Sequence, residues 1–244
     1  MNLEDSAGNV VSGCVPAALE YLELAQHQLR CFVGDPVASV DAALEAGPEM
    51  AMGHLLHAYL HLLGTEPDGI AVARESHRRA LALPMTERER AHQVAVGHLV
   101  RGRWADAGRT LEDLSIDHPL DALALQAGHQ IDFFRGDSRM LHDRIARALP
   151  HWGVDTPGFH AVLGMLAFGL EETGRYARAE DVGRRCVEIE PLDGWGQHAV
   201  AHVLEMQGRR QEGIEWMRGN VAAWSENSFF ATHNWWHLAL YHLE

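Results

Sequence analysis

Four glycines at a nearly constant interval constrain the fold of this 244-residue chain more than any other feature. Gly102, Gly136, Gly174 and Gly208 are separated by 34, 38 and 34 residues. A 34-residue period is typical of the tetratricopeptide repeat, a helix–turn–helix unit. Glycine suits the sharp turn from helix A into helix B because it adopts left-handed backbone angles at little cost. The spacing therefore predicts a stack of helix pairs.

Residues around Gly174 define the clearest unit. Tyr176 and Ala179 follow the glycine at the spacing where helix B packs on helix A. Pro191 ends the unit, because a helix cannot continue through proline. An earlier unit, which ends at Pro119, has the same pattern of a glycine, an aromatic residue, an alanine and a closing proline. These signals predict antiparallel helix pairs rather than isolated helices.

Further residues of the same kinds mark the remaining boundaries. Gly34 and Gly64 are expected to form two more turns. Thr156 is expected to cap a helix that starts with Pro157, and Asp193 to cap the next one. The expected A helices lie near residues 15–33, 49–63, 86–101, 119–135, 157–173, 194–207 and 228–244. The expected B helices lie near residues 36–46, 67–82, 104–114, 138–149, 176–189 and 210–224. We find no alternating strand pattern with hairpin turns.

The chain is therefore expected to form one all-α, tetratricopeptide-type superhelix over residues 1–244. Hydrophobic residues make up 47% of the sequence, enough for a substantial core, and disorder is expected at most in the first ten or so residues. Each pair exposes an apolar face that only its neighbour covers, so the array is one domain. The last helix, 234–244, is apolar and aromatic with no helix after it. It is expected either to pair with a second copy or to continue into a longer protein.

Charge and cysteine usage narrow the classes of partner. The formal net charge is −14, and an acidic surface argues against binding to nucleic acid or to anionic membranes. The three cysteines, Cys14, Cys31 and Cys186, are far apart and form no CxxC pair, which suits a reducing compartment. The N-terminus has no apolar segment typical of a signal peptide. A cytoplasmic protein is expected.

Histidine is unusually frequent, with 17 residues, and many fall on the face of helix A that lines the groove of such a superhelix. His198, His202 and Glu205 span only about 60° of a helical wheel at 100° per residue. His233 and His237 are four residues apart on the last helix. The residues expected to line the groove are His54, His61, His92, His129, Trp195, His198, His202, Glu205, His233, Trp236 and His237.

Three interpretations of this face remain open. Neutral histidines often satisfy one another inside a structure without any ligand. Aromatic and polar residues in a groove can also receive a small molecule or a peptide segment. Alternatively, a Zn or Fe ion is bound by a His/carboxylate set, for which the candidates are His198, His202, Glu205, His233 and His237. The set is not the H-E-x-x-H motif, since Ala199 follows His198.

Two carboxylates are candidates for acid–base catalysis. Glu205 lies on the histidine face, and Glu171 precedes Glu172 at the end of the helix before Gly174. Paired carboxylates can serve as acid and base. A solvated helix end is the commoner explanation of the Glu171–Glu172 pair.

Four runs of sequence resemble the tetratricopeptide repeat protein 38 family. They are IARALPHW (145–152), LGMLAFGLEET (163–173), HAVAHVLEM (198–206) and HNWWHLALYH (233–242). The resemblance covers most of the chain and implies an α-solenoid in which the histidine-bearing A helices are part of the family pattern. It implies no reaction. Members of the family are longer, so the chain is expected to correspond to the N-terminal part of such a protein.

Three functions are therefore compared below. The favoured hypothesis is a binding protein whose histidine-rich groove receives a small molecule or peptide. The first alternative is a metal-dependent enzyme that uses the His/carboxylate set. The second alternative is a structural or assembly module that self-associates through its last helix.

Overall fold

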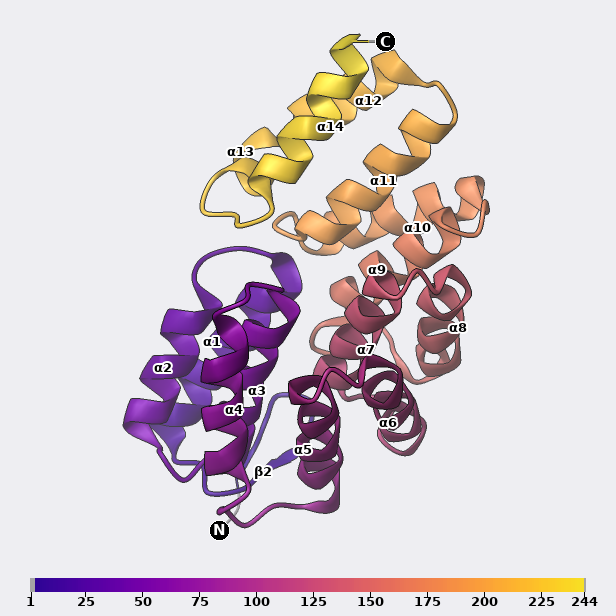
Figure 1. Cartoon of the computed structure of the whole chain (residues 1–244). Coiled ribbons are helices and arrows are strands. Elements are labelled where there is room, and N and C mark those ends of the chain that lie inside the picture. The colour runs from indigo at the N-terminus through magenta and orange to yellow at the C-terminus, as the bar shows by residue number, and fades with distance from the viewer. Residues whose placement is uncertain (1–2, 244) are drawn as a thin grey trace.

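The computed structural model describes residues 3–243, and that part of the chain is almost entirely helical. Successive helices pack tightly in pairs along the chain, from the indigo N-terminal end to the yellow C-terminal end of Figure 1. The helices are α1 (Pro16–Cys31), α2 (Pro36–Ala46), α3 (Ala51–Leu63), α4 (Gly69–Ala80), α5 (Glu87–Val100), α6 (Trp104–Asp117), α7 (Ala122–Phe134), α8 (Ser138–Ala148), the 3-10 turn η1 (Leu149–His151), α9 (Phe159–Glu171), α10 (Tyr176–Ile189), α11 (Gly194–Met206), α12 (Arg210–Gly219), α13 (Val221–Ser225) and α14 (Ala231–Leu243). The expected all-α class is confirmed.

The expected helices are present to within a few residues, and one of them is divided. The segment expected as 210–224 forms α12 and α13, because Asn220 leaves helical geometry between them. The side-chain amide of Asn220 donates a hydrogen bond to the Pro191 carbonyl, 2.9 Å away. This contact fixes the bend against the preceding helix pair.

The repeated glycines have the backbone conformation that the repeat requires. Gly102, Gly136, Gly174 and Gly208 have φ angles of 71°, 68°, 74° and 65°. These values lie in the left-handed region that other residues rarely adopt. Gly34 and Gly64 also lie at turns between helices, as expected. Gly34 is left-handed, whereas Gly64 is right-handed helical and Thr65 takes the left-handed position.

The two expected N-caps have different outcomes. Asp193 caps α11, and its Oδ1 accepts hydrogen bonds from the backbone N–H groups of Trp195 and Gly196 at 3.1 and 2.8 Å. Thr156 does not cap α9, because left-handed Gly158 stands at the N-cap position. Thr156 Oγ1 instead accepts a hydrogen bond from Gly153 N at 3.1 Å, so it closes the preceding turn.

The N-terminal segment contains two short strands that were not expected. Strands β1 (Leu3–Glu4) and β2 (Val10–Val11) pair antiparallel. The Asp5 carboxylate organises their turn by accepting hydrogen bonds from the N–H groups of Ala7 and Asn9 at 3.0 and 2.8 Å. Residues 3–11 therefore have a defined structure, although the sequence left disorder possible there, and residues 1–2 lie outside the described part.

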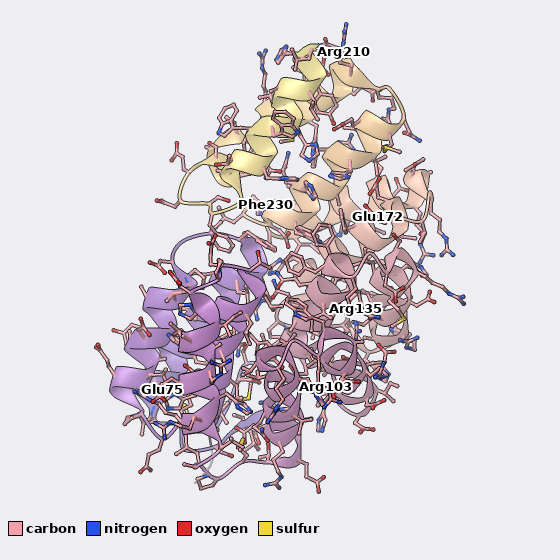
Figure 2. All side chains as sticks on the ribbon, viewed as in Figure 1. Glu75, Arg103, Arg135, Glu172, Arg210 and Phe230 are labelled. Carbon is pink, nitrogen blue, oxygen red and sulfur yellow. The ribbon has the colours of Figure 1, made fainter. Side chains whose placement is uncertain are left out.

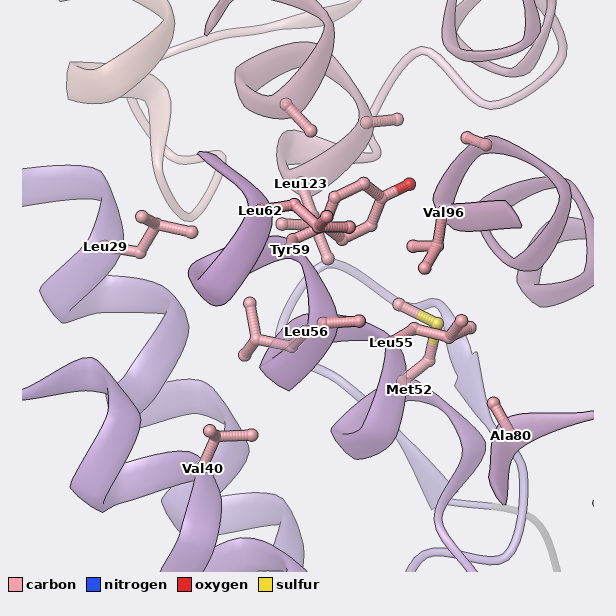
Figure 3. Close-up of a cluster of buried hydrophobic side chains, with 14 of the residues drawn as sticks. Leu29, Val40, Met52, Leu55, Leu56, Tyr59, Leu62, Ala80, Val96 and Leu123 are labelled. Carbon is pink, nitrogen blue, oxygen red and sulfur yellow. The ribbon is translucent and has the colours of Figure 1, made fainter. Parts of the chain in front are cut away.

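Helix α3 is the centre of the N-terminal core. Figure 3 shows Met52, Leu55 and Leu56 from α3 between Val40 on one side and Val96 on the other. All of these side chains are buried. Burial on opposite sides explains why α3 is apolar around most of its circumference.

The two ends of the helical array meet. The loop after α1 pairs with the loop before α14 through a bridge between Val33 and Ser228, and Ser228 Oγ donates to the Phe32 carbonyl at 2.9 Å. Phe32 also stacks on Trp195 with ring centres 5.3 Å apart. Figure 1 shows the two loops next to each other, and Figure 2 labels Phe230 between the N-terminal and C-terminal helices. The array therefore closes on itself.

Within the described residues, no helix is long and apolar enough to cross a membrane. The last helix keeps part of its apolar surface in solvent: Trp236 is 59% exposed and Trp235 is 47% exposed. Trp235 packs on Trp224 with ring centres 4.8 Å apart.

Candidate metal centre

Four histidines from two helices converge near the C-terminal end. His198 and His202 lie on α11, and His233 and His237 lie on α14. Residues four apart share one helical face, and α11 contacts α14, so the two pairs face each other. Each histidine contributes one nitrogen to a group whose four atoms lie within 4.8 Å of one another. We call these four residues the histidine cluster.

The helices that carry the cluster are fixed by their packing. The Tyr241 hydroxyl of α14 donates to the Ala201 carbonyl of α11 at 2.5 Å. Gly213 on α12 leaves room for the Tyr241 ring, because a Cβ atom there would overlap it. Both contacts hold α14 in register with α11, so His233 and His237 remain opposite His198 and His202.

Direct nitrogen–nitrogen contacts join the two helices. His233 Nε2 lies 2.9 Å from His198 Nε2 and 3.1 Å from His237 Nε2. His202 is packed into the same group, with its ring centre 4.2 Å from that of His198 and 4.6 Å from that of His237. The four imidazoles therefore enclose one small volume.

Two carboxylates flank the cluster. Glu205 Oε2 accepts a hydrogen bond from His237 Nδ1 at 2.9 Å, which leaves Nε2 of that ring directed at His233. Glu171 Oε2 lies 3.5 Å from His202 Nδ1, too far for a good hydrogen bond. Metal-binding histidines typically have such a carboxylate behind the ring. Glu205, expected as a ligand, therefore lies behind His237 instead of within the group of four.

Glu171 is not part of a solvated helix end, which corrects the commoner explanation of the Glu171–Glu172 pair. Its side chain is buried at the end of α9, whereas Glu172 is exposed. The reason is that α11 packs along α9 and covers the Glu171 side of the helix. The buried carboxylate faces His202, which makes Glu171 part of the site.

The environment of the cluster favours neutral imidazoles. Burial, followed by the neighbouring histidines, lowers the pKa of His198 well below its ordinary value. Burial and the nearby His237 lower the pKa of His233 to about 4, and burial also lowers the pKa of His237. A neutral imidazole offers the lone pair that binds a metal ion. Near pH 7 these three imidazoles can therefore act as nitrogen ligands.

Three buried polar atoms at this site make no hydrogen bond within the protein. They are Nδ1 of His198, Nε2 of His202 and Oε2 of Glu171. A buried polar atom without a partner costs about 1–3 kcal/mol. Their presence together indicates that the site fits a bound cation.

Aromatic rings cover the cluster on the side of the chain junction. Phe168 stacks on His198 with ring centres 5.5 Å apart, and Trp195 lies 5.1 Å from the same ring. Phe230 lies 5.1 Å from His198 and 4.9 Å from His233. These rings limit access of water and strengthen electrostatic interactions inside the site. Trp195 was expected in the groove from the sequence, whereas Phe168 and Phe230 were not.

The other histidines expected in the groove do not join this cluster. His54 Nε2 hydrogen-bonds to the Pro48 carbonyl at 2.9 Å, and His129 Nε2 to the Met165 carbonyl at 3.2 Å. His61 packs beside His57 with ring centres 4.6 Å apart.

His92 has a structural role in the N-terminal half. It is fully buried between the Tyr59 hydroxyl at 3.2 Å and the Asp121 carboxylate at 2.9 Å. At the end of α1, the Leu29 carbonyl accepts a hydrogen bond from the side-chain amide of Gln126 on α7 at 3.0 Å, so the first helix reaches the middle of the array. Trp236 is largely exposed, since it lies about 100° around α14 from His237.

A separate apolar cavity lies beside the cluster. Its volume is about 500 Å³, and Phe230, which contacts the cluster, is one of its walls. Gln130 also lines it, and Gln130 Oε1 is buried without a hydrogen-bond partner. Its main apolar walls are Leu29, Phe32, Val37, Leu60, Leu63 and Phe229.

The donor set defines the chemistry that this centre can perform. Imidazole nitrogens with carboxylates behind them suit Zn²⁺ and Fe²⁺. No protein-family model matches the chain. The assignment of a function therefore depends on the geometry of the site itself.

Proposed function

We propose that this chain is a tetratricopeptide-type helical-repeat protein that binds one Zn²⁺ or Fe²⁺ ion through the histidine cluster. The observation that carries the proposal is the convergence of four imidazoles, whose ligand atoms lie within 4.8 Å of one another. His198 and His237 each contact His233 Nε2, at 2.9 and 3.1 Å. With metal–nitrogen bonds of about 2.0–2.1 Å, neighbouring ligand atoms stand about 2.9–3.4 Å apart. The observed spacing supports a single ion.

The distribution of protons also supports a metal ion. Two neutral imidazole nitrogens form a hydrogen bond only when one of them carries a proton. The Glu205 carboxylate can only accept, so His237 Nδ1 carries the proton and His237 Nε2 presents a lone pair. His233 Nε2 must then donate to His237, and the same single hydrogen also faces His198. A metal ion in place of that hydrogen would bind the Nε2 lone pairs of His198, His233 and His237 at once.

Three observations support the repeat type within the proposal. Left-handed glycines recur at about the tetratricopeptide period, helices pack in consecutive pairs, and the chain resembles the tetratricopeptide repeat protein 38 family. The three cysteines are free thiols, which supports the reducing, cytoplasmic compartment proposed from the sequence.

Binding of a small molecule next to the metal is a second candidate function, favoured by the apolar cavity. A volume of about 500 Å³ suits a small organic molecule. The unpaired Gln130 Oε1 would accept a hydrogen bond from a donor on that molecule. Phe230 lines the cavity and also packs on His233, so the two sites share a wall.

Elemental analysis of untagged protein tests the metal proposal. The wild type should contain about one equivalent more Zn or Fe than the His198→Ala/His202→Ala variant, since that variant loses two of four ligands. His151→Ala is the matched control, because His151 is exposed and outside the cluster. Equal metal content in the wild type and in a folded double variant would reject the proposed site.

A further inference from the structure

Histidine and cysteine also meet at a second place, where the first helix contacts the middle of the chain. His27 and Cys31 lie on α1, His160 lies at the start of α9, and Glu190 follows α10. Each contributes one ligand-type atom, and these four atoms lie within 4.8 Å of one another. Cys31 is fully buried and His160 is buried. This group shares no residue with the histidine cluster.

The distances within α1 are close to those of a zinc site. Cys31 Sγ lies 3.9 Å from both ring nitrogens of His27, one helical turn earlier. Ligands of a tetrahedral zinc ion with Zn–S of about 2.3 Å and Zn–N of about 2.0–2.1 Å stand about 3.6 Å apart. A small rotation of the half-buried His27 ring is enough to reach that spacing.

His160 is oriented by a buried carboxylate. Its Nδ1 lies 2.7 Å from Oδ2 of Asp193, which is fully buried. The other oxygen of Asp193 caps α11, so the carboxylate cannot turn away. His160 Nε2 is thereby left as the free nitrogen of the ring. A carboxylate behind a histidine is the usual support of a metal ligand.

The charges at this place are suited to a divalent cation. A Cys31 thiolate and the Glu190 carboxylate together neutralise the two charges of a zinc ion. Arg30 lies close enough to interact electrostatically with Cys31 and, more weakly, with the Asp193 carboxylate. The donor set of two histidines, one cysteine and one carboxylate is chemically that of zinc.

We propose that His27, Cys31, His160 and Glu190 form a second metal site, which binds Zn²⁺ and fastens α1 to α9 and α10. Binding forms a Zn–S bond and releases the thiol proton of Cys31 to solvent. The ion bridges the first helix of the array and its fifth helix pair, near the Val33–Ser228 contact that closes the chain. This site stands independently of the histidine cluster.

Titration of untagged, reduced protein with Co²⁺ tests the second site, because cobalt occupies zinc sites and reports sulfur ligation by its near-ultraviolet charge-transfer band. The wild type should show this band. The band should disappear in Cys31→Ser and persist in Cys14→Ser, a half-buried cysteine outside the site. It should also persist in His198→Ala/His202→Ala, which separates this proposal from the first.

A second variant keeps the test decisive if Cys31→Ser does not fold. Glu190 is only half-buried, so Glu190→Gln should fold and should weaken cobalt binding at the sulfur-containing site by more than about tenfold. The absence of a charge-transfer band in the wild type, or unchanged affinity in Glu190→Gln, would overturn the proposal.

Discussion

Nδ1 of His237 donates a hydrogen bond to Oε2 of Glu205 over 2.9 Å, so a side chain of α11 fixes the ring of a histidine on α14. This contact selects the tautomer in which His237 Nε2 faces the other histidines. Glu205 thus acts as a positioning residue for the proposed metal ion, although the sequence suggested a ligand.

Replacing Glu205 by glutamine should weaken metal binding without removing a ligand. Glutamine lacks the negative charge of Glu205, which makes the His237 ring a stronger electron donor to a metal ion. The affinity for Zn²⁺ should therefore fall by about 10–100-fold. Competition with a chromophoric chelator measures this change. Glu66→Gln, at an exposed position, is the control. Equal affinities in the two variants would contradict the positioning role.

The stability of the metal-free protein should fall in acid partly because of His129. Burial, the main cause, lowers the pKa of His129 to about 3 in the folded state, against an ordinary value of 6.5. The unfolded chain therefore takes up a proton at higher pH than the folded chain does. The free energy of unfolding is unaffected by this group above pH 6.5 and falls as the pH drops towards 3, by on the order of 5 kcal/mol in all.

His129→Gln isolates this contribution, since glutamine can still donate to the Met165 carbonyl. Urea unfolding in the presence of a chelator, repeated between pH 7 and 4, should show a shallower loss of unfolding free energy in the variant. Parallel pH profiles for the wild type and the variant would argue against a buried, neutral His129.

Asp132 should stabilise the fold through Arg144. Arg144 Nε donates to Asp132 Oδ2 at 2.8 Å, and both side chains are about 2% exposed. Arg135, three residues after Asp132, is exposed. Asp132→Ala leaves the buried arginine with only the Glu112 carboxylate, 2.9 Å from Nη1, and should lower the free energy of unfolding by about 2–3 kcal/mol.

Arg135→Ala is the matched control for that pair and should change stability by less than about 0.5 kcal/mol. Urea denaturation followed by circular dichroism compares both variants. If the two substitutions lower the free energy of unfolding by the same amount, the pairing of Asp132 with Arg144 is not important for stability.

The apolar cavity should bind an aromatic amine. N-phenyl-1-naphthylamine carries one N–H donor for Gln130 Oε1 and fluoresces strongly in apolar surroundings. Leu60→Trp fills the cavity and should abolish the signal, whereas Leu81→Trp, at an exposed leucine elsewhere, should not. Gln130→Leu should reduce the affinity by about 5–10-fold through loss of one hydrogen bond. Equal fluorescence in the two tryptophan variants would exclude the cavity as the binding site.

The helices could be predicted from the sequence because their limits depend on local residues. A glycine such as Gly174 indicates a turn, and a proline such as Pro191 indicates the end of a helix, whatever the distant parts of the chain do. The division of the segment after Arg210 was missed, because it depends on the contact between Asn220 and the Pro191 carbonyl. That contact joins residues of different repeats and leaves no local pattern.

The candidate site was predictable in part for the same reason. His198 and His202 share a helical face by their spacing, as do His233 and His237. The burial of Glu171 and the approach of Cys31 to His160 depend on how distant helices pack. The closure of the array, in which the loop after α1 meets the loop before α14, likewise has no signal in a repeat pattern.

The most direct test of the account is a crystal structure of the untagged chain grown with Zn²⁺, with diffraction data collected at the zinc absorption edge. We predict an anomalous peak enclosed by the nitrogens of His198, His202, His233 and His237, with His237 Nδ1 still bonded to Glu205. A well-ordered histidine cluster with no anomalous peak would contradict the proposal that this protein binds metal there.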